Sequence, residues 1–463
     1  MIQMEEMTLQ AWLKKVKASL TDMKEQVLIS WTEKIAPISL IDLLKRTERS
    51  EEDRLFWANN ERDFMLLGLG TTEVMVAEED RYEELDKQWK QLVEEAYIYN
   101  PYMEEGTGLT ALGGMTFDPL HEGSELWRLY PTSQLTLPRY LVSFTNGAYY
   151  FTVNRYVKKD ENLSTVVEEI EDQLQSLQKE DETFEPLRQR IVKRLEKDPE
   201  AWKASVQRAV DTIRAQEAEK IVLARELRLT FQDRVQISLL IERLMDSQSQ
   251  AYVFAYEQGD DCFLGASPER LVYVRGDELL STCLAGTAPR GKNTKEDEEI
   301  AKEQLMENSK NREEHDHVVQ MIKGSIAPFT EKTHIPDTPV VLTLRNLQHL
   351  YTPVRARLKA GVSVFQLIEV LHPTPALGGV PRDKALAFIR EEEQFDRGWY
   401  GAPIGWIDYQ GNSEFAVAIR SGLVQGNEMS LFAGCGVMAD SDPEEEYKET
   451  AVKFLPLLTI LED

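Results

Sequence analysis

Residues 433–453 read AGCGVMADSDPEEEYKETAVK and hold the densest structural signals of the chain. A glycine-rich turn leads into Ser441-Asp442-Pro443, which predicts a helix start because Pro is tolerated in the first turn of a helix. Glu446, Glu449 and Lys453 follow at spacings of three and four, so they share one helical face. Carboxylates beside glycines can hold a hydrated divalent cation and an anionic ligand. The spacing alone favours an ordinary solvated face.

Length and composition limit the classes of protein to which this chain can belong. The 463 residues fit one large domain or two to three average ones, and 42% hydrophobic residues suffice for a packed core. The net charge of −27 argues against nucleic-acid and membrane partners, since both require a basic surface. Three cysteines without metal-ligand spacing fit a reducing compartment. We also find neither a signal peptide nor an apolar run of roughly 20 residues, and therefore expect a cytoplasmic protein.

The first half of the chain alternates helical and strand-like patterns. We expect an amphipathic helix and a connecting segment in 1–50, two strands in 55–77, a helix in 80–97, strands in 113–157 with a hairpin at Asn146-Gly147, and exposed helix in 158–200. The last of these segments is highly charged. We place there a boundary between a variable N-terminal half, 1–200, which contributes to the same fold, and a catalytic part, 201–463.

The second half carries more strands. We expect a strand from Lys220, a meander in 251–285, a long helix in 295–326, further strands in 338–345, 403–409, 413–424 and 429–439, and helices in 362–371, 382–394 and after 440. Tight turns join most strands, which predicts largely antiparallel sheets with helices packed outside, an α+β fold.

Three charged residues stand where chemistry is possible. Lys220 precedes Ile-Val-Leu, and burial or a nearby cation would favour the neutral amine, a base. Glu269 follows the turn Ala266-Ser-Pro268 and suits a general acid if its surroundings raise its pKa. Glu314 lies at the apolar edge of a helix and could meet a metal ion. A strand-edge lysine fits Lys220 better when it is taken alone, and a simple turn fits Glu269 equally well.

Two histidines and two glycine-rich segments complete the candidates. His315-x-His317 resembles a zinc pair, but positions two apart on a helix point in different directions, so we reject zinc. Residues 284–291, LAGTAPRG, expose backbone amides suited to an anion or to a plain turn. Residues 371–379, LHPTPALGG, are stiffened by two prolines.

In this order the segments resemble the chorismate-utilising enzymes, and among them most closely the isochorismate synthases. The resemblance covers about half of the chain strongly, while FWANNERDFMLLGLG and GGMTFDP extend it weakly into the first half. It implies two large, mostly antiparallel sheets packed together, with helices outside. The matching segments are KIVLAR (220–225), FLGASPERL (263–271), LAGTAPRG (284–291), KNREEH (310–315), NLQHL (346–350), LHPTPALGG (371–379), RGWYGAPIGW (397–406), AVAIRSG (416–422) and AGCGVMADSDPEEEYKET (433–450).

The resemblance also implies a role for each matched position. Lys220 corresponds to the general base and Glu269 to the general acid. Glu314 and Glu449 correspond to Mg²⁺ ligands, and Glu446 reaches the ion through water. The remaining matches bind chorismate: Tyr400, Arg420 and Lys453 hold its carboxylates with amides near Gly434 and Gly436, and His349, Ala376 and Leu377 line the ring pocket.

The implied reaction is a Mg²⁺-dependent isomerisation of chorismate without a redox cofactor. Water attacks ring carbon 2, the carbon 4 hydroxyl leaves and the ring double bonds shift. Lys220 must start neutral and Glu269 protonated. The net charge of −27 repels this dianion, although salt screens the repulsion over about 8 Å, so Arg420, Lys453 and Mg²⁺ must reverse the sign locally.

Ala376-Leu377 distinguishes between members of the family. Pro-Ala-Leu at this place favours isochorismate synthases over salicylate synthases, which expel pyruvate, and over anthranilate or aminodeoxychorismate synthases, which use ammonia. We expect no obligatory glutaminase subunit. The long N-terminal part favours the menaquinone branch over a siderophore branch. The chain departs from the family pattern at 215–219, where its relatives often have a glycine. A non-catalytic relative that only binds a ligand is a further alternative for the function.

Overall fold

A computed structural model describes residues 7–19, 25–48, 50–179, 184–186, 189–343 and 347–462. The first third of the chain forms α1 (Leu9–Ser19), β1 (Gln26–Ile35), α2 (Leu40–Arg46), β2 (Arg54–Ala58), β3 (Phe64–Val76), α3 (Arg81–Glu95), β4 (Tyr97–Tyr99), β5 (Thr110–Met115), the 3₁₀ turn η1 (Glu125–Trp127), β6 (Ser133–Thr145) and β7 (Ala148–Lys158).

The middle of the chain links this part to the site. Its elements are α4 (Leu163–Gln178), β8 (Ile191–Glu196), α5 (Pro199–Arg214), β9 (Lys220–Phe231), α6 (Ile237–Ser247), β10 (Tyr252–Gln258), β11 (Asp261–Ser267), β12 (Arg270–Arg275) and β13 (Glu278–Pro289).

The last third begins with a bent helical segment and ends with a long helix. It comprises α7 (Thr294–Ile300), the π-helical η2 (Ala301–Met306), α8 (Ser309–Ile326), η3 (Ala327–Phe329), β14 (Thr330–His334), β15 (Val340–Thr343), β16 (Leu347–Leu358), α9 (Val364–Leu371), β17 (Gly379–Val380), α10 (Arg382–Glu392), β18 (Pro403–Asp408), β19 (Ser413–Val417), β20 (Ser421–Gln425), β21 (Glu428–Val437) and α11 (Pro443–Glu462).

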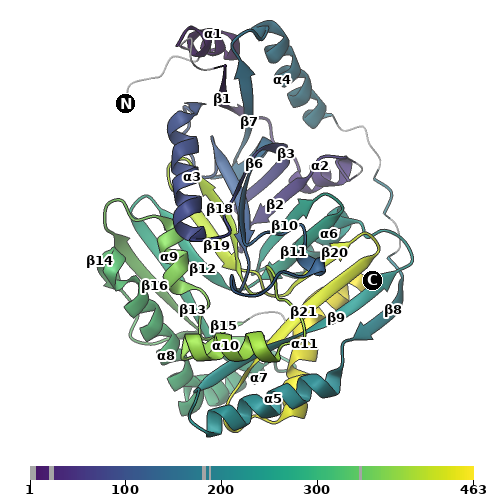
Figure 1. Ribbon diagram of the computed structural model, residues 1–463, viewed down its shortest axis with the longest axis vertical. Coiled ribbons are helices and arrows are strands. Elements are labelled where there is room, and N and C mark those ends of the chain that lie inside the picture. Colours follow the sequence, from purple (N-terminus) through teal and green to yellow (C-terminus); the bar gives the residue numbers. More distant parts are fainter. Residues whose placement is uncertain are drawn as a thin grey trace.

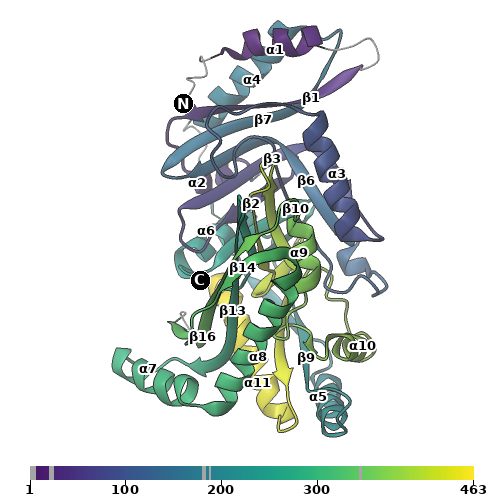
Figure 2. The same cartoon turned by 90° about the vertical axis from the view of Figure 1, so that its left-hand side faces the viewer.

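Hydrogen bonds join the described strands into one curled sheet of 21 strands with helices on its outer side (Figures 1 and 2). The pair β1–β4 is parallel, and every other pair between described strands is antiparallel. The α+β prediction is therefore confirmed. The two large sheets expected from the resemblance are connected to each other through shared strand pairs.

Strands from both sides of residue 200 pair with each other. β2 pairs with β10 through contacts such as Phe56 with Ala255, and β5 pairs with β18. Two large hydrophobic clusters also combine residues from both halves, for example Leu28 with Val437 in one and Trp12 with Leu461 in the other. The halves thus share one sheet and one interior.

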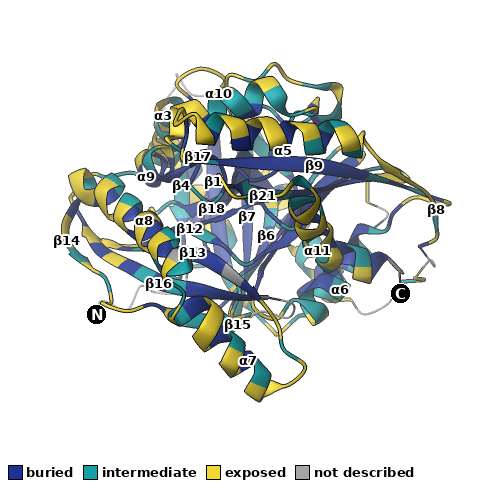
Figure 3. Ribbon diagram, turned by 90° about the horizontal axis from the view of Figure 1, so that it is seen from below, coloured by how far each residue is buried: buried dark blue, intermediate teal, exposed yellow. Residues whose placement is uncertain are grey.

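Helices α5, α10 and α11 cover the end of the sheet that contains β9 and β21 (Figure 3). The sequence explains α5: Asp198 caps it by accepting from the Ala201 N–H, and Pro199 occupies its first turn. Its buried side chains include Trp202 and Val206, which face the sheet, and the opposite side of the helix is exposed. The outer helix layer therefore fixes β9, the strand that begins with Lys220.

The structure corrects four local predictions. Strand β1 occupies part of 1–50, and β8 occupies part of 158–200, where we expected helix or connection. The helix expected over 295–326 is broken where Asn308 caps α8 by accepting from the Asn311 N–H. The strand expected over 413–424 divides into β19 and β20 because Arg420 adopts a left-handed conformation, φ 53°. The 55–77 strand pair and the Asn146-Gly147 hairpin are confirmed.

Candidate functional site

A cavity of about 280 Å³ opens between β9, β21 and α11 on one side and β13, β16 and α8 on the other. This volume is near the lower end of the range of about 300–1,000 Å³ that small-molecule sites occupy. Every residue predicted for the site lines this cavity: Lys220, Glu269, Glu314, His349, Ala376, Leu377, Tyr400, Arg420, Gly434, Gly436, Glu446, Glu449 and Lys453.

The antiparallel pair β9–β21 builds the floor of the cavity. Its register places Val222 opposite Gly436 and Ala224 opposite Gly434. A Cβ atom on Gly436 would lie 2.7 Å from Cε and 3.3 Å from Nζ of Lys220, closer than side chains pack. Gly436 therefore provides the space in which the Lys220 side chain lies.

Lys220 and Glu314 form an ion pair across the cavity. The Lys220 Nζ lies 2.5 Å from Glu314 Oε1, and the two side chains are 11% and 34% exposed. The pair brings two of the predicted residues, one from β9 and one from α8, into direct contact.

Glu269 lies at the corner where β11 ends. Its N–H donates to Ser267 Oγ and its carbonyl accepts from the Val417 N–H, so the backbone is fixed on both sides. Burial raises the pKa of Glu269 to about 7, although the positive charges of Arg420 and Lys220 oppose this rise. Glu269 can therefore carry a proton near neutral pH, as a general acid requires.

Arg420 and Tyr400 add a cation and a phenol to one wall. Arg420 sits in the break between β19 and β20, where its carbonyl accepts from the Ala266 N–H at 3.1 Å. Tyr400 is buried, which raises its pKa to about 12, so it remains a neutral hydroxyl donor. Its hydroxyl lies beside Gly434, where an added Cβ would be 3.4 Å from Tyr400 Oη, an ordinary van der Waals contact.

The polar face of α11 forms a further wall. Lys453 Nζ donates to the Gly434 carbonyl at 2.8 Å and pairs with Glu449 Oε1 at 2.6 Å. Glu446 Oε1 accepts from Ser441 Oγ at 2.6 Å. Among the described residues no partner is found for the buried Glu446 Oε2, and burial raises the pKa of Glu446. The expected common face of these residues is present and points into the cavity.

His349 and the loop that follows α9 complete the lining. His349 is buried on β16, and its Nδ1 lies 3.3 Å from the Gly286 carbonyl. Burial, followed by the charge of Arg420, lowers the pKa of His349 to about 3, so the ring is neutral and donates to this carbonyl. Leu377 is also buried and offers an apolar surface beside Ala376.

The glutamates that line the cavity are candidate ligands for a metal ion. Within the described ranges, no three His, Cys, Asp or Glu side chains lie close enough together to enclose one. Mg²⁺ does not require such a cage, because it keeps several waters and is usually bound through one or two carboxylates. Glu314, Glu446 and Glu449 line one cavity, and Glu446 Oε2 is a buried acceptor without a hydrogen-bond partner. These carboxylate oxygens are therefore the type of ligand that hydrated Mg²⁺ prefers.

Several lining residues were absent from the prediction. They include Asn311, Arg397 and Ser441, all of which lie inside the quoted motifs, so their position in those motifs was the available signal. His315 is buried and contacts Thr352 Oγ1 through Nε2 at 2.7 Å, whereas His317 is exposed. The two rings thus face different surroundings, as the spacing argument required.

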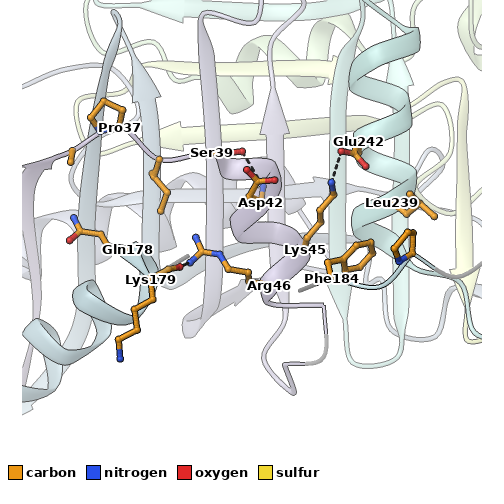
Figure 4. A pocket seen from close by; sticks show the side chains of 13 residues that line it. Pro37, Ser39, Asp42, Lys45, Arg46, Gln178, Lys179, Phe184, Leu239 and Glu242 are labelled. Carbon is orange, nitrogen blue, oxygen red and sulfur yellow. Dashed lines mark hydrogen bonds and ion pairs between the residues drawn. The ribbon is translucent and has the colours of Figure 1, made fainter. Parts of the chain in front are cut away.

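A larger cavity, of about 810 Å³, lies elsewhere, between α2, α6 and the end of α4 (Figure 4). Lys45 reaches Glu242 across it, and Arg46 donates to the carbonyls of Leu177 and Lys179. It contains none of the predicted site residues, so size alone does not identify the site.

The segment before Lys220 has its own geometry. Gln216 adopts φ 61° in the turn from α5 to β9, a conformation that favours glycine. The Glu219 N–H nevertheless donates to the Val380 carbonyl at 2.7 Å, so β9 starts in a fixed position. The departure from the family pattern at 215–219 is thus accommodated by a left-handed glutamine.

Comparison with known proteins identifies the family of the chain. The family model described as chorismate binding enzyme matches residues 12–462. The chain is 38% identical to the isochorismate synthase MenF of Bacillus subtilis, over 95% of this chain and 94% of that one. It is 34% identical to the salicylate biosynthesis isochorismate synthase of Pseudomonas aeruginosa, over 92% and 89%.

Solved structures give the same fold. The menaquinone-specific isochorismate synthase MenF of Escherichia coli superimposes with a TM-score of 0.78 at 25% identity, covering 94% of each chain. Anthranilate synthase component I of Streptococcus pneumoniae superimposes with a TM-score of 0.68 at 18% identity and shows the fold alone. The resemblance drawn from the motifs is thereby confirmed, and the chain belongs to the chorismate-binding enzyme family, in which two relatives matched over 94% and 89% of their length are named isochorismate synthases.

Proposed function

We propose that the chain is an isochorismate synthase, an isomerase that converts chorismate into isochorismate. The observation that carries this proposal is one cavity in which Lys220 and a Glu269 whose pKa is about 7 lie beside the cationic side chains of Arg420 and Lys453 and the neutral Tyr400. A base and an acid in one small pocket suit a reaction that takes up one water and releases another.

The chain's own residues divide the work. Arg420, Tyr400 and Lys453 bind the substrate carboxylates, assisted by backbone amides near Gly434 and Gly436, and His349, Ala376 and Leu377 hold the ring. Lys220 accepts a proton from the water whose oxygen bonds to ring carbon 2. Glu269 donates its proton to the carbon 4 hydroxyl, which leaves as water while the double bonds shift. No electrons are gained or lost.

We infer Mg²⁺ as the cofactor from the donor set. Glu314 and Glu449 would hold it directly, with Glu446 through water, and the bound ion would supply positive charge to the substrate carboxylates.

The menaquinone branch is the pathway that we propose. This proposal is supported by MenF of B. subtilis, at 38% identity over 95% of this chain, and by the fold of the menaquinone-specific MenF of E. coli; the salicylate biosynthesis enzyme of P. aeruginosa follows at 34% over 92%. We also propose a cytoplasmic location and no obligatory glutaminase subunit. The three cysteines are buried and unpaired, which fits a reducing compartment. Of the described helices, none has the length and apolar character to cross a membrane.

One assay tests the function. The purified chain, given chorismate and Mg²⁺ without ammonia, is expected to form isochorismate in equilibrium with chorismate and to release no pyruvate, and chelation by EDTA should stop the reaction. Stoichiometric pyruvate would identify a salicylate synthase. Turnover only with ammonia would identify an aminating synthase, and binding without turnover would identify a non-catalytic relative.

Gly436→Ala should lower activity without unfolding the protein. The added methyl would lie 2.7 Å from Lys220 Cε, the far end of a flexible side chain, so the lysine rather than the backbone moves. A displacement of about 1 Å can cost about 10²-fold in kcat. Gly324→Ala on α8 is the control, because its added methyl meets no atom within 4 Å. Gly426→Ala would be unsuitable, because Gly426 has a φ of 64° and a side chain there adds backbone strain. Equal kcat in the Gly436 and Gly324 variants would contradict this placement of Lys220.

A further inference from the structure

A buried ion pair connects the strand of Lys220 with the loop of Leu377. Arg397 and Glu393 are 5% and 3% exposed, and Arg397 Nε donates to Glu393 Oε2 at 2.7 Å. Arg397 Nη1 donates to the Leu377 carbonyl at 3.0 Å, and Nη2 donates to the Val222 carbonyl at 2.8 Å and to Glu393 Oε1. One guanidinium thus spans both segments.

Glu393 strengthens the same connection from the other side. Its Oε1 accepts from the Ala224 N–H at 2.7 Å, so the pair is bonded to β9 at two residues on either side of Leu223. The Arg397 guanidinium also lies 4.1 Å from the centre of the Phe117 ring, which fixes its plane. These hydrogen bonds use four of the five N–H groups of Arg397, and every acceptor belongs to the protein, so the guanidinium holds segments together.

We propose that Arg397, with Glu393, is a positioning residue for the isomerisation. It fixes the distance between β9, which presents Lys220, and the loop that presents Ala376 and Leu377, so the base and the ring pocket keep one relative placement. This inference rests on the proposed function for its kinetic consequence, while the connection itself is independent of any substrate.

The choice of arginine supports a geometric role. Burying an ion pair brings little net stability, because desolvation offsets the attraction. A planar fork can bind a carboxylate and two carbonyls at fixed angles, whereas the flexible ammonium of lysine cannot. If this position needed only a positive charge, lysine could replace arginine. If it needs the planar fork, lysine cannot.

The test compares Arg397→Lys with Arg54→Lys. Arg54 is a matched control because it is also 5% exposed, forms a fork with Glu257 and donates to the Leu44 carbonyl, yet lies outside the cavity lining. Since a displacement of about 1 Å can cost about 10²-fold, we expect Arg397→Lys to lower kcat to that extent and to raise KM, and to move the pH profile of kcat/KM. Arg54→Lys should leave all three unchanged, because neither Arg54 nor its partners Glu257 and Leu44 line the cavity.

Hydrogen exchange separates this proposal from the function itself. In the ligand-free protein, Arg397→Lys should speed amide exchange in 219–224 and in 376–380 together, relative to Arg54→Lys. If the wild-type chain does not convert chorismate, the proposed function fails and the exchange result still decides the positioning role. The positioning role of Arg397 would be wrong if amide exchange in both segments were unchanged. It would also be wrong if, in an active enzyme, Arg397→Lys had the same kcat and pH profile as Arg54→Lys.

Discussion

Lys220→Ala should lower kcat for chorismate by about 10²–10⁴-fold, the contribution typical of a positioned general base. The protein should still fold, because the Glu314 side chain that loses its partner is 34% exposed and can be hydrated. Single-turnover kinetics and thermal unfolding measure the two effects separately. Binding of chorismate should weaken far less than turnover.

Lys203→Ala provides the control for this substitution. Lys203 also pairs with glutamates, Glu200 and Glu444, but it lies on α5 and outside the cavity lining. Its removal should leave kcat unchanged. If Lys220→Ala unfolds the chain, or retains more than a tenth of wild-type kcat, the lysine has a structural role and the proposed mechanism is wrong.

Glu269→Gln should remove the acid and lower kcat by about 10²–10⁴-fold. The amide is close in shape to the carboxyl group but cannot give a proton to the departing hydroxyl. The wild-type kcat/KM should fall as pH rises through about 7, where Glu269 of the free enzyme loses its proton, and the variant should lack this decrease. If the variant still lost activity as pH rises through about 7, a group other than Glu269 would be responsible for that loss.

The same substitution should stabilise the fold at alkaline pH. Burial raises the pKa of Glu269 from 4.5 to about 7, so the folded state binds its proton more tightly than the unfolded state. Wild-type stability therefore falls between pH 4.5 and 7 on account of this group and levels off above. At pH 8, Glu269→Gln should gain up to about 3 kcal/mol, since each pKa unit is about 1.4 kcal/mol. Denaturant unfolding at pH 4 and pH 8 would show the difference.

The strand pairs that tight turns join were predictable from sequence, and those that long connections join were not. Asn146-Gly147 supplies the two positive φ angles of a hairpin turn, so β6 and β7 could be predicted together. β1 was missed because it is buried over most of its length and shows no alternation of polar and apolar residues. Its partners, β7 and β4, lie far along the chain, where local pattern carries no information.

The lining of the cavity could be predicted from the order of the motifs, but the interactions within it could not. Sequence order placed Lys220 and Glu314 in the same pocket, yet their ion pair depends on where α8 begins, and the break at Asn308 was not expected. Arg397 was overlooked for a related reason. Glu393 lies only four residues before it, but the other two partners, Val222 and Leu377, are backbone carbonyls from distant segments, and a carbonyl leaves no mark in the sequence.

The pairing of β9 with β21 has a consequence for biosynthesis. Ile221 pairs with Val437 and Val222 with Gly436, across more of the chain than any hairpin spans. Contacts this remote make folding slow, because a long loop must close before they contribute. On the ribosome, Lys220 emerges well before Gly436 is translated, so the pocket cannot close around a ligand until translation has passed β21.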